Sequence, residues 1–538
     1  MGKAILCACE DVTLDDVRRA FEKGHRDIES VKRYTGFGTG PCQAKSCLAL
    51  IARELLRLGA TPTELEPFTA RPPVDAMPLA ALAAIDPATL PIVPGVPLSG
   101  AHGGAQQQVA GERGRAVTTP SCQRAPGAPV RAARERAGAL AASPDEPASG
   151  APRPSSPLPG KASIVIIGGG IMGLGLAYQL AKRGTADVVV LERGYLNAGA
   201  SGRNGGGVRM QWTTPTMVRL AKRSIELMRG FATELGVNVW LRQGGYLFLA
   251  PTRAQVERLE RNIKVHEAEG LRTRILSPME ALEVTPELDP SSFVAAAYNP
   301  DDGTVFPWPF LYGYAQRAEA LGAKICTFTG VTGFRTSGAS ITHVETDRGP
   351  IACDTVVLAA GAWSKEIAAL AGVSVPNRPT RHEILVTESM KPWLDPLVSM
   401  LGNGLYFSQS QRGEIVGGMG DPLEPEGVEE RSTLRFLARF ARAITTCAPV
   451  TGGIKVVRQW AGCYDVTPDN NPILGAAGFG NFLQLHGWVG HGFMMAPAVT
   501  ELMAEWMTGG RPHELFERFT IDRFSREGGA AREDFIIG

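Results

Sequence analysis

The sequence lacks any apolar run long enough to cross a membrane, and it carries almost no net charge. Its 538 residues include 55 basic and 54 acidic side chains, a formal net charge of +1. A membrane-spanning helix needs 18 or more mostly apolar residues, and nucleic-acid-binding proteins usually present an excess of basic charge. We therefore expect no membrane span and no nucleic-acid partner.

The N-terminus also lacks the apolar core of a signal peptide, because a cysteine follows at position 7 and an acid at position 10. This predicts a cytoplasmic protein. Cysteines in that compartment are more often reduced thiols or metal ligands than disulfides. Five of the nine cysteines show no close pairing and are expected to be ordinary thiols: Cys122, Cys326, Cys353, Cys447 and Cys463.

Aromatic residues are nearly missing from residues 67–160, where Phe68 stands alone while 17 of the 39 prolines are found. Such a segment cannot bury enough apolar surface to offset its ordering entropy. It predicts a flexible linker between one domain at 1–66 and another at 161–538. One exception is the apolar run Pro78–Ile85, which we expect to dock on a folded part.

Residues 1–66 show helical patterning, with a capping box at Thr13 and Asp16 and further helices expected at 28–32 and 46–58. The region holds four cysteines in two close pairs. The second pair lies at the start of the third expected helix, where backbone N–H groups and the helix dipole favour negative charge. Four thiolates suit zinc or an iron–sulfur cluster, and the spacing alone does not separate the two. The candidate ligands are Cys7, Cys9, Cys42 and Cys47.

A dinucleotide-binding fingerprint begins the second domain. The apolar run 164–167 predicts a strand buried on both faces, and the G-x-G-x-x-G motif that follows precedes an expected helix to about residue 183. A second apolar strand, 188–191, ends in an acid at the spacing that holds a ribose hydroxyl. The glycines allow close approach of a pyrophosphate to the helix N-terminus. The predicted cofactor residues are Gly168, Gly170, Gly173 and Glu192.

Three later features favour FAD over NAD. Residues 198–207 form a second loop of small residues, suited to an extended pyrophosphate and flavin. An apolar strand at 355–359 leads to a glycine placed to close the adenine side. Residues 486–492 precede a helix expected at 493–507, whose N-terminus can stabilise negative charge on a reduced flavin. Further cofactor-binding candidates come from these features: Ser201, Gly205, Gly361, Gly490 and Gly492.

Several blocks in matching order resemble the D-amino-acid-oxidase-like flavoproteins over residues 163–525: 199–212, 244–249, 458–462, 467–469 and 490–497. Within that superfamily they are most similar to the beta subunit of heterotetrameric sarcosine oxidase and of dye-linked L-proline dehydrogenase. The resemblance implies an α/β fold in which a Rossmann-like FAD-binding domain is interleaved with an α+β mixed-sheet substrate domain. It also implies oxidation of an N-alkyl or cyclic amino acid by hydride transfer to flavin N5, with a neutral substrate amine.

The same blocks supply the candidate pocket residues. His491, at the helix N-terminus, lies against the flavin pyrimidine edge or only caps the helix. Arg209 lies near the flavin ring or forms a surface ion pair. His382 is expected to open a strand that borders the substrate. The remaining candidates either face the pocket or pack in the core: Tyr246, Arg458 and Tyr464, with Asp469 expected at the cofactor.

Departures from the family limit what carries over. The stretch 303–309 lacks the histidine that binds FMN covalently in the sarcosine oxidase beta subunits, so FMN is doubtful. The cysteine that tethers FAD in monomeric relatives is replaced by Gly462, and Cys463 is one residue out of register. We therefore expect non-covalent FAD. The basic residues that hold the substrate carboxylate in monomeric sarcosine oxidase also lack clear counterparts.

The blocks 7–13, 32–35 and 40–42 resemble the bacterioferritin-associated-ferredoxin-like domain, a small helical domain that holds a [2Fe–2S] cluster. Together the two resemblances imply an amine or imino-acid dehydrogenase whose electrons leave through the cluster to a second flavoprotein subunit or another acceptor. Two alternatives stay open: a glycerol-3-phosphate or 2-hydroxy-acid dehydrogenase, and a non-catalytic electron-transfer subunit.

Overall fold

The computed structural model describes residues 4–39, 44–65, 76–93, 157–185, 187–525 and 532–533. The described residues on both sides of Ser99–Ala151 belong to one compact unit. Cys42 and Cys122 lie outside the described residues.

The N-terminal region is a small helical fold around its own apolar core. The hairpin of β1 (Ile5–Cys7) and β2 (Val12–Thr13) leads into α1 (Leu14–Glu22), whose capping box between Thr13 and Asp16 confirms the prediction. Two further helices follow, α2 (Ile28–Thr35) and α3 (Leu48–Arg57), close to their expected positions. The core that these elements enclose includes Val17, Val31, Phe37, Ile51 and Leu55.

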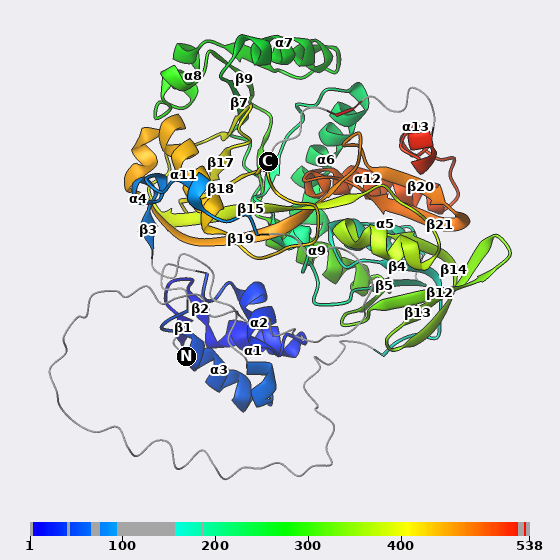
Figure 1. Cartoon of the computed structure of the whole chain (residues 1–538). Helices are drawn as coiled ribbons and strands as arrows, with labels where there is room; N and C mark the ends of the chain where they lie inside the picture. The colour runs from blue at the N-terminus through cyan, green and yellow to red at the C-terminus, as the bar shows by residue number, and fades with distance from the viewer. Residues whose placement is uncertain are drawn as a thin grey trace, which may run out of the picture. The chain divides into compact units, whose positions relative to one another are not determined.

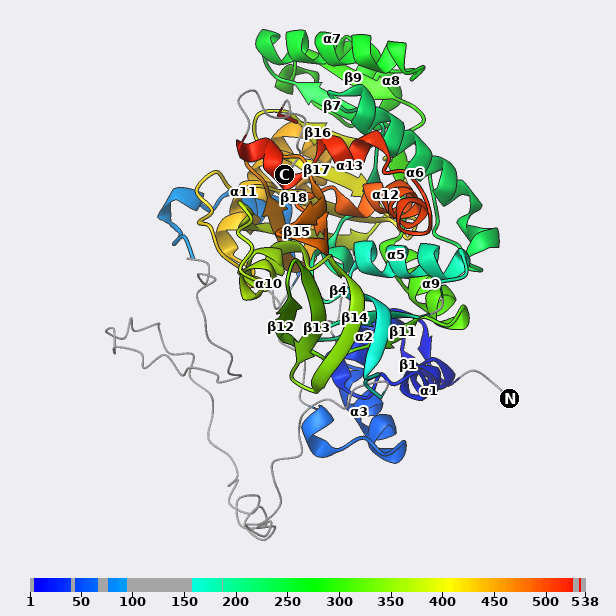
Figure 2. The same cartoon turned by 90° about the vertical axis from the view of Figure 1, so that its right-hand side faces the viewer.

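The dinucleotide-binding part is built on an eight-stranded sheet. Parallel pairing joins β11, β5, β4, β14 and β21, and the antiparallel strands β12, β13 and β20 extend it (Figure 2). The strands are β4 (Lys161–Ile167), β5 (Val188–Leu191), β11 (Lys324–Cys326), β12 (Val331–Ser337), β13 (Ser340–Thr346), β14 (Gly349–Leu358), β20 (Ile473–Ala477) and β21 (Phe479–His486).

Strand β4 is buried on both faces, as its continuous apolar run predicts. Ile164 and Ile166 belong to the core beneath the helices α5, α6, α9 and α12, whereas Val165 and Ile167 face the core on the other side of the sheet. This alternation follows from the two-residue repeat of a strand. The helices are α5 (Ile171–Lys182), α6 (Pro215–Glu234), α9 (Pro307–Ala320), α10 (Ser364–Leu370), α12 (Gly492–Met507) and α13 (Glu514–Arg518).

A nine-stranded mixed sheet forms the second domain, in the order β3-β19-β15-β18-β17-β16-β7-β9-β8. Its strands alternate along the chain with those of the first sheet, so the two domains are interleaved. The strands are β3 (Met77–Pro78), β7 (Tyr246–Ala250), β8 (Arg274–Leu276), β9 (Ala295–Asn299), β15 (Arg378–Ser389), β16 (Leu397–Met400), β17 (Tyr406–Gln409), β18 (Glu414–Met419) and β19 (Lys455–Val466). The other elements here are α7 (Arg253–Ala268), α8 (Pro278–Val284), α11 (Leu434–Cys447) and the short pair β6 (Gly207–Val208) with β10 (Gly303–Thr304).

Residues 76–93, here named the strap, form part of this second domain. Strand β3 pairs with the edge of β19, and α4 (Leu79–Ala83) packs on α11 (Figure 1). Leu79 and Leu82 are fully buried in the core that α11 covers. The apolar run Pro78–Ile85 therefore docks, and this stretch of the segment expected to be a linker is ordered.

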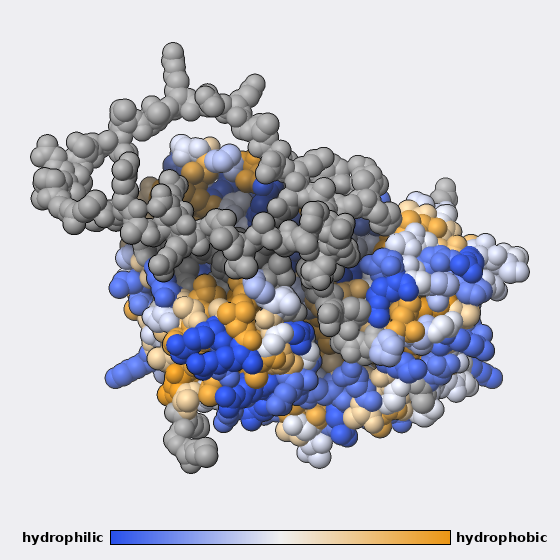
Figure 3. Space-filling view, turned by 90° about the horizontal axis from the view of Figure 1, so that it is seen from below, coloured by the Kyte–Doolittle hydropathy of each residue, from blue (hydrophilic) through white to orange (hydrophobic). Residues whose placement is uncertain are grey.

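Apolar and hydrophilic residues are interspersed on the coloured part of the face seen from below (Figure 3). Scattered apolar side chains are normal on a folded surface. Within the described residues, no helix combines the length and hydropathy needed to cross a bilayer.

Candidate functional site

The glycine fingerprint lies where β4, α5 and β14 meet. Gly168 has a φ of +121°, and a Cβ there would lie 2.3 Å from the carbonyl oxygen of Ala359 on the neighbouring strand end. A Cβ on Gly173 would lie 2.0 Å from the carbonyl oxygen of Gly168. Only glycine permits both the backbone turn and this close helix–strand packing, which leaves the N-terminus of α5 open to a phosphate. Gly170 is the N-cap of that helix.

The acid at the end of β5 and the second small-residue loop converge on the same turn. Glu192 accepts hydrogen bonds from the backbone N–H of Gly169 at 2.9 Å and of Gly194 at 2.8 Å. Burial raises the pKa of Glu192, and the two hydrogen bonds oppose that shift. Ser201 Oγ accepts a hydrogen bond at 2.9 Å from the N–H of Ile171, which lies in the first turn of α5. The acid and the second small-residue loop therefore both bond to the backbone of the glycine turn, the position that the fingerprint predicts for them.

The loop after β14 and the one after β5 meet on the adenine side of the expected cofactor. The Arg193 guanidinium lies 4.1 Å from the centre of the Trp363 ring. Gly361 has a φ of +53° at the start of that turn. An aromatic ring and a cation therefore lie in this turn, and a role of Gly361 on the adenine side stays a prediction.

A buried cluster around Arg209 joins the two domains of the catalytic part. Arg209 is fully buried, donates to the carbonyl oxygen of Gln211, and its Nη2 lies 3.4 Å from His491 Nε2. Its guanidinium also covers the Trp212 ring at 3.9 Å, and that ring meets His491 edge-on at 4.9 Å. Arg209 is thus held beside the N-terminus of α12, and the surface ion pair considered for it does not apply.

His491 is the N-cap residue of α12, but its side chain makes no capping hydrogen bond. Within the described residues, His491 Nδ1 and Trp488 Nε1 are buried and have no hydrogen-bond partner. Buried polar atoms without partners are rare and need a bound ligand or water. This loop therefore fits a polar ring edge such as that of a flavin.

A second group of rings lies on the face of the nine-stranded sheet that carries Tyr464. His382 stacks on Tyr464 with ring centres 4.5 Å apart, and its Nε2 is 3.0 Å from the Tyr406 hydroxyl. His382 lies within β15 rather than opening it, which corrects the expected position. A Cβ on Gly490 would lie 2.3 Å from the Tyr464 ring, and one on Gly205 would lie 3.6 Å from the Tyr406 ring. The rings therefore line the side of the sheet that faces the two glycine-containing loops, 198–207 and 486–492.

Five buried ring side chains, here named the wall, are uncharged near neutral pH: His382, His491, Tyr246, Tyr406 and Tyr464. Burial lowers the pKa of His382 to about 3, and burial together with Arg209 and His382 lowers the pKa of His491 well below its usual value. Burial raises the hydroxyl pKa of the three tyrosines of the wall above the ordinary value, those of Tyr246, Tyr406 and Tyr464. Arginine stays protonated, so the cation among these side chains is Arg209.

Asp302, which sequence reasoning missed, holds the segment that carries Arg209. Its carboxylate accepts from the N–H of Met210 at 2.7 Å, from Gln211 Nε2 at 3.0 Å and from Asn299 Nδ2 at 2.9 Å. Burial is the largest influence on this carboxyl and raises its pKa to about 7. Tyr406 and Trp212 were missed as well. The acid pair before Gly303 was the one available signal for Asp302, and no motif marked the other two.

Two expected site residues make other contacts. Asp469 forms a bidentate ion pair with Arg523 at 2.8 and 2.9 Å, which anchors the C-terminal segment. The Arg458 guanidinium lies 5.2 Å from the centre of the Trp460 ring, and Trp460 in turn donates to the carbonyl oxygen of Arg203. Gly492 packs on Trp488. Arg458 therefore lies on the same face of β19 as Trp460 and Tyr464, and its role in the site stays a prediction.

Three of the four candidate metal ligands are described. Cys7, at the end of β1, and Cys47, the N-cap of α3, are buried, and Cys9 is exposed. Within the described residues, no three potential ligands are grouped closely enough to hold a metal ion. The fourth candidate ligand, Cys42, lies outside the described residues.

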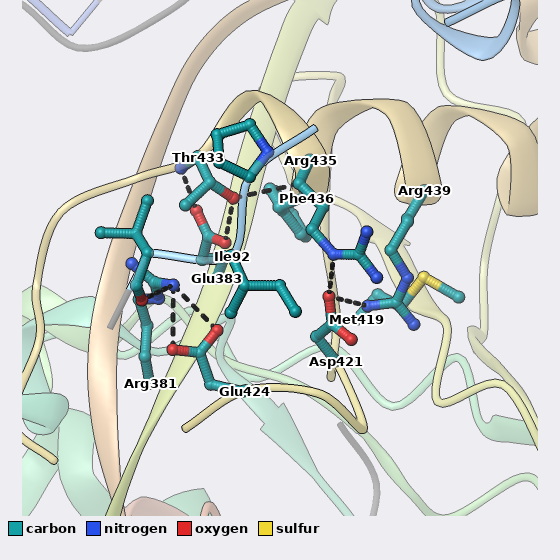
Figure 4. Close-up of a pocket in the computed structure, with 12 residues that line it drawn as sticks. Ile92, Arg381, Glu383, Met419, Asp421, Glu424, Thr433, Arg435, Phe436 and Arg439 are labelled. Atoms are coloured by element: carbon teal, nitrogen blue, oxygen red, sulfur yellow. Dashed lines mark hydrogen bonds and ion pairs between the residues drawn. The ribbon is translucent and has the colours of Figure 1, made fainter. Parts of the chain in front are cut away.

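A cavity of about 10 Å³ lies on the opposite face of β15, beneath the strap (Figure 4). It is lined by ion pairs, Arg381 with Glu424 at 2.9 Å and Arg435 with Asp421 at 2.7 Å, and Arg381 also donates to the carbonyl oxygen of Val93 in the strap. This volume admits at most one water molecule. The cavity therefore belongs to the attachment of the strap and not to a substrate site.

The site defines the class of this protein as a two-domain, dinucleotide-binding oxidoreductase. The features that define it are the glycine fingerprint, the acid at the end of β5 and the wall of aromatic residues. The family model for FAD dependent oxidoreductases matches residues 163–506. The chain belongs to this family and is an FAD-dependent oxidoreductase. The model for the sarcosine oxidase A3 domain matches residues 1–86.

Known proteins of the same family are similar over about two thirds of the chain. The sarcosine oxidase subunit beta of Rhizobium meliloti (strain 1021) is 30% identical over 68% of this chain and 88% of its own. The 4-methylaminobutanoate oxidase (formaldehyde-forming) of Paenarthrobacter nicotinovorans is 30% identical over 69% of this chain and 46% of its own. The crystal structure of L-proline dehydrogenase from P. horikoshii is 36% identical and covers 70% of this chain and 100% of its own, with a TM-score of 0.66.

Proposed function

We propose that this chain oxidises a secondary amine or imino acid of the sarcosine, proline, hydroxyproline or opine class. The observation that carries the proposal is the group of buried neutral rings formed by His382, Tyr406 and Tyr464, packed against the loops that carry Gly205 and Gly490. FAD, when bound, accepts a hydride from the carbon next to the substrate nitrogen. The relatives named for sarcosine, 4-methylaminobutanoate and L-proline support the same substrate class.

The chain's own side chains suit an uncharged amine. A substrate nitrogen must carry a free electron pair as the hydride leaves, so the pocket should not stabilise an ammonium group. His382, Tyr406 and Tyr464 are neutral, and His382 and Tyr406 hold each other at 3.0 Å. Arg209 is the buried cation beside this group, and we propose that its positive charge favours a substrate that carries a carboxylate. Trp212 and Phe248, both buried, cover the Arg209 guanidinium.

Non-covalent FAD is part of the proposal. Cys463 lies on the opposite face of β19 from Gly462, because side chains alternate along a strand. Its thiol donates to the carbonyl oxygen of Glu429 at 3.4 Å, and burial raises its pKa to about 12. A buried, protonated thiol is a poor nucleophile. Acid or heat should therefore release the flavin from the protein.

Anaerobic bleaching of the bound flavin tests the activity. Purified protein is mixed without oxygen with sarcosine, each enantiomer of proline, hydroxyproline, an opine, a D-amino acid and glycerol 3-phosphate in turn. We expect loss of the 450 nm band with one secondary amine or imino acid and none with glycerol 3-phosphate. Bleaching by glycerol 3-phosphate alone would assign the chain to the alcohol-oxidising alternative. No bleaching by any compound would favour the electron-transfer alternative.

The N-terminal cysteines are proposed to hold a [2Fe–2S] cluster that passes electrons on one at a time. The support is the set of four cysteines in two pairs, with Cys47 at the N-terminus of α3, where the helix dipole favours net negative charge. Iron and acid-labile sulfide at two each per chain are expected. Stoichiometric zinc without sulfide would contradict this.

Contacts between the N-terminal region and the flavin-binding region support an electron path within one chain. The Arg33 guanidinium lies 4.0 Å from the centre of the Tyr195 ring, and Tyr34 meets Tyr312 edge-on at 5.5 Å. Glu10, next to Cys9, pairs with Arg412 at 2.5 Å. These aromatic and charged contacts favour docking of the cysteine-bearing region on its own flavin domain. A dehydrogenase that passes its electrons to a second flavoprotein subunit is the form of enzyme that we propose, located in the cytoplasm.

A further inference from the structure

The C-terminal segment reaches into the flavin-binding region through one residue, Glu533, which is fully buried. Thr213 Oγ1 donates to its Oε2 at 2.6 Å. Its backbone N–H donates to the carbonyl oxygen of Asp469 at 3.0 Å, and its carbonyl oxygen accepts from Asn470 Nδ2 at 3.0 Å. Glu533 is therefore fixed by side chain and backbone to two loops that are far apart in the sequence.

Both of these loops belong to the site. Thr213 follows Trp212, the ring that Arg209 covers and that meets His491 edge-on. The loop with Asp469 and Asn470 follows Asp465, whose carboxylate accepts from the N–H of Gly487 at 2.7 Å in the segment that leads to His491. The side-chain carboxylate of Glu533 is thus bonded to the residue next to Trp212, whose ring contacts the buried cation.

The carboxylate of Glu533 is important because Arg209 is a buried cation. Burial of an unbalanced charge costs several kcal/mol, so buried charges are found with compensating partners. Burial lowers the pKa of Arg209, while Tyr246, Glu533 and Asp302 raise it. Burial raises the pKa of Asp302 to about 7, so its carboxyl is only partly charged near neutral pH.

We propose that Glu533 is a positioning residue of the flavin site, whose carboxylate compensates the charge of Arg209 and thereby lowers the reduction potential of the bound FAD. Two-electron reduction places negative charge on the flavin, which a nearby cation favours and a nearby carboxylate opposes. A residue near the end of the chain would then tune the cofactor without contact with the substrate. The inference needs bound FAD but not the proposed amine substrate.

The test is the midpoint potential of the FAD-loaded full chain, measured by reduction against redox dyes without substrate. Glu533→Gln keeps an oxygen for the Thr213 hydrogen bond but removes the charge. We expect two-electron reduction to become at least tenfold more favourable, a shift of about 30 mV to more positive potential. Glu517→Gln, an exposed acid of α13, is the matched control and should leave the potential unchanged.

A double-mutant cycle shows whether the effect acts through the cation. In an Arg209→Met background, the shift caused by Glu533→Gln should disappear. An unchanged potential in the single variant, or an equal shift in both backgrounds, would overturn the proposal. A chain that ends at residue 530 provides a second variant and should show the same shift. Loss of FAD from both variants would also overturn it, because Glu533 would then be a structural support.

Discussion

At the scale of single residues, the proposed site separates charge from the rings that we expect to face the substrate. Arg209 lies fully buried with carboxylates behind it, whereas His382, Tyr406 and Tyr464 are neutral on the side of the flavin loops. The low pKa of His382 has one main cause, the loss of solvation on burial. The charge states of these side chains are therefore determined by burial more than by ion pairing.

The hydroxyl of Tyr406 is expected to contribute to substrate oxidation through His382. Tyr406→Phe leaves His382 Nε2 without its partner at 3.0 Å in a buried site. Loss of a hydrogen bond of this kind costs about 0.5–1.5 kcal/mol, so the rate of flavin reduction by substrate should fall roughly two- to tenfold. Stopped-flow absorbance measures this rate. Tyr178→Phe, which removes a buried hydroxyl bonded to Glu234, should leave the rate unchanged.

Asp302 should make stability depend on pH between about 4 and 7. Its pKa rises from 3.8 to about 7 on folding, so the folded protein binds a proton that the unfolded chain has released in this range. The contribution of Asp302 to stability is therefore full below pH 4 and is lost as pH rises through 7, by at most about 1.4 kcal/mol per pH unit. Asp302→Asn should remove this dependence in urea unfolding at pH 5 and 7.5.

The neighbouring acid supplies a control of opposite sign. The ion pair with Arg272 lowers the pKa of Asp301 below its usual value. Its contribution to stability is present above the unfolded value and is lost as pH falls. Asp301→Asn should therefore leave the Asp302 dependence in place. Parallel profiles for wild type and Asp302→Asn would show that Asp302 does not titrate in this range.

At the scale of elements, the strap ties the region before the linker to the edge of the second sheet. Strand β3 extends β19, and three arginines donate to strap carbonyl oxygens: Arg381 to Val93, Arg435 to Pro87 and Arg442 to Ile85. Each backbone oxygen is thus satisfied by a charged donor from the sheet or from α11. The strap covers the face of β15 that is turned away from His382.

Leu82→Ala should release the strap. Leu82 is fully buried in the core under α11, and truncation of such a leucine costs about 2–5 kcal/mol. We expect faster amide hydrogen exchange in β3 and α4, including the Leu79 N–H that bonds Ile454, while β4 and β5 keep their protection. Ile92→Ala, at a side chain 45% exposed, is the control. Unchanged exchange in Leu82→Ala would mean that the arginine contacts alone hold the strap.

At the scale of the whole molecule, two modules for which we propose different chemistry are joined in one chain. Hydride transfer delivers two electrons to a flavin, and an iron–sulfur cluster accepts one at a time. The contacts of Arg33 with Tyr195 and of Glu10 with Arg412 keep the N-terminal region on the flavin-binding part. A relay inside one chain follows from this arrangement if the cysteines hold the proposed cluster.

Cys42→Ser should separate the two halves of the reaction. Flavin reduction by substrate should stay near the wild-type rate, because the residues proposed to line the site all lie between Gly168 and Gly492. Turnover with the physiological acceptor should be lost. Cys353→Ser, at a buried thiol of the other module, is the control for thiol loss. Normal turnover of Cys42→Ser, or stoichiometric hydrogen peroxide from the wild type alone at full rate, would contradict the relay.

The sequence by itself determined the strand–helix–strand unit that is proposed to bind the cofactor, because that unit is local. Gly168, Gly173 and Glu192 lie within one strand–helix–strand unit, and the steric need for glycine and the spacing to the acid are properties of the chain. The capping box at Thr13 and the buried strand at 164–167 are local in the same way. The docking of residues 78–85 was also expected, since an apolar run in a polar segment must be buried somewhere.

Only the tertiary structure decided the composition of the pocket wall and where the strap docks. His382, Tyr406, Tyr464 and Gly490 come from different strands and loops, and no periodicity in the sequence relates them. Asp469 stands in a family block, but the fold pairs it with Arg523. Glu533 is near the chain end, yet Thr213 binds it. Such pairings depend on which segments the sheet order brings together, and burial then decides which of the paired groups carry charge.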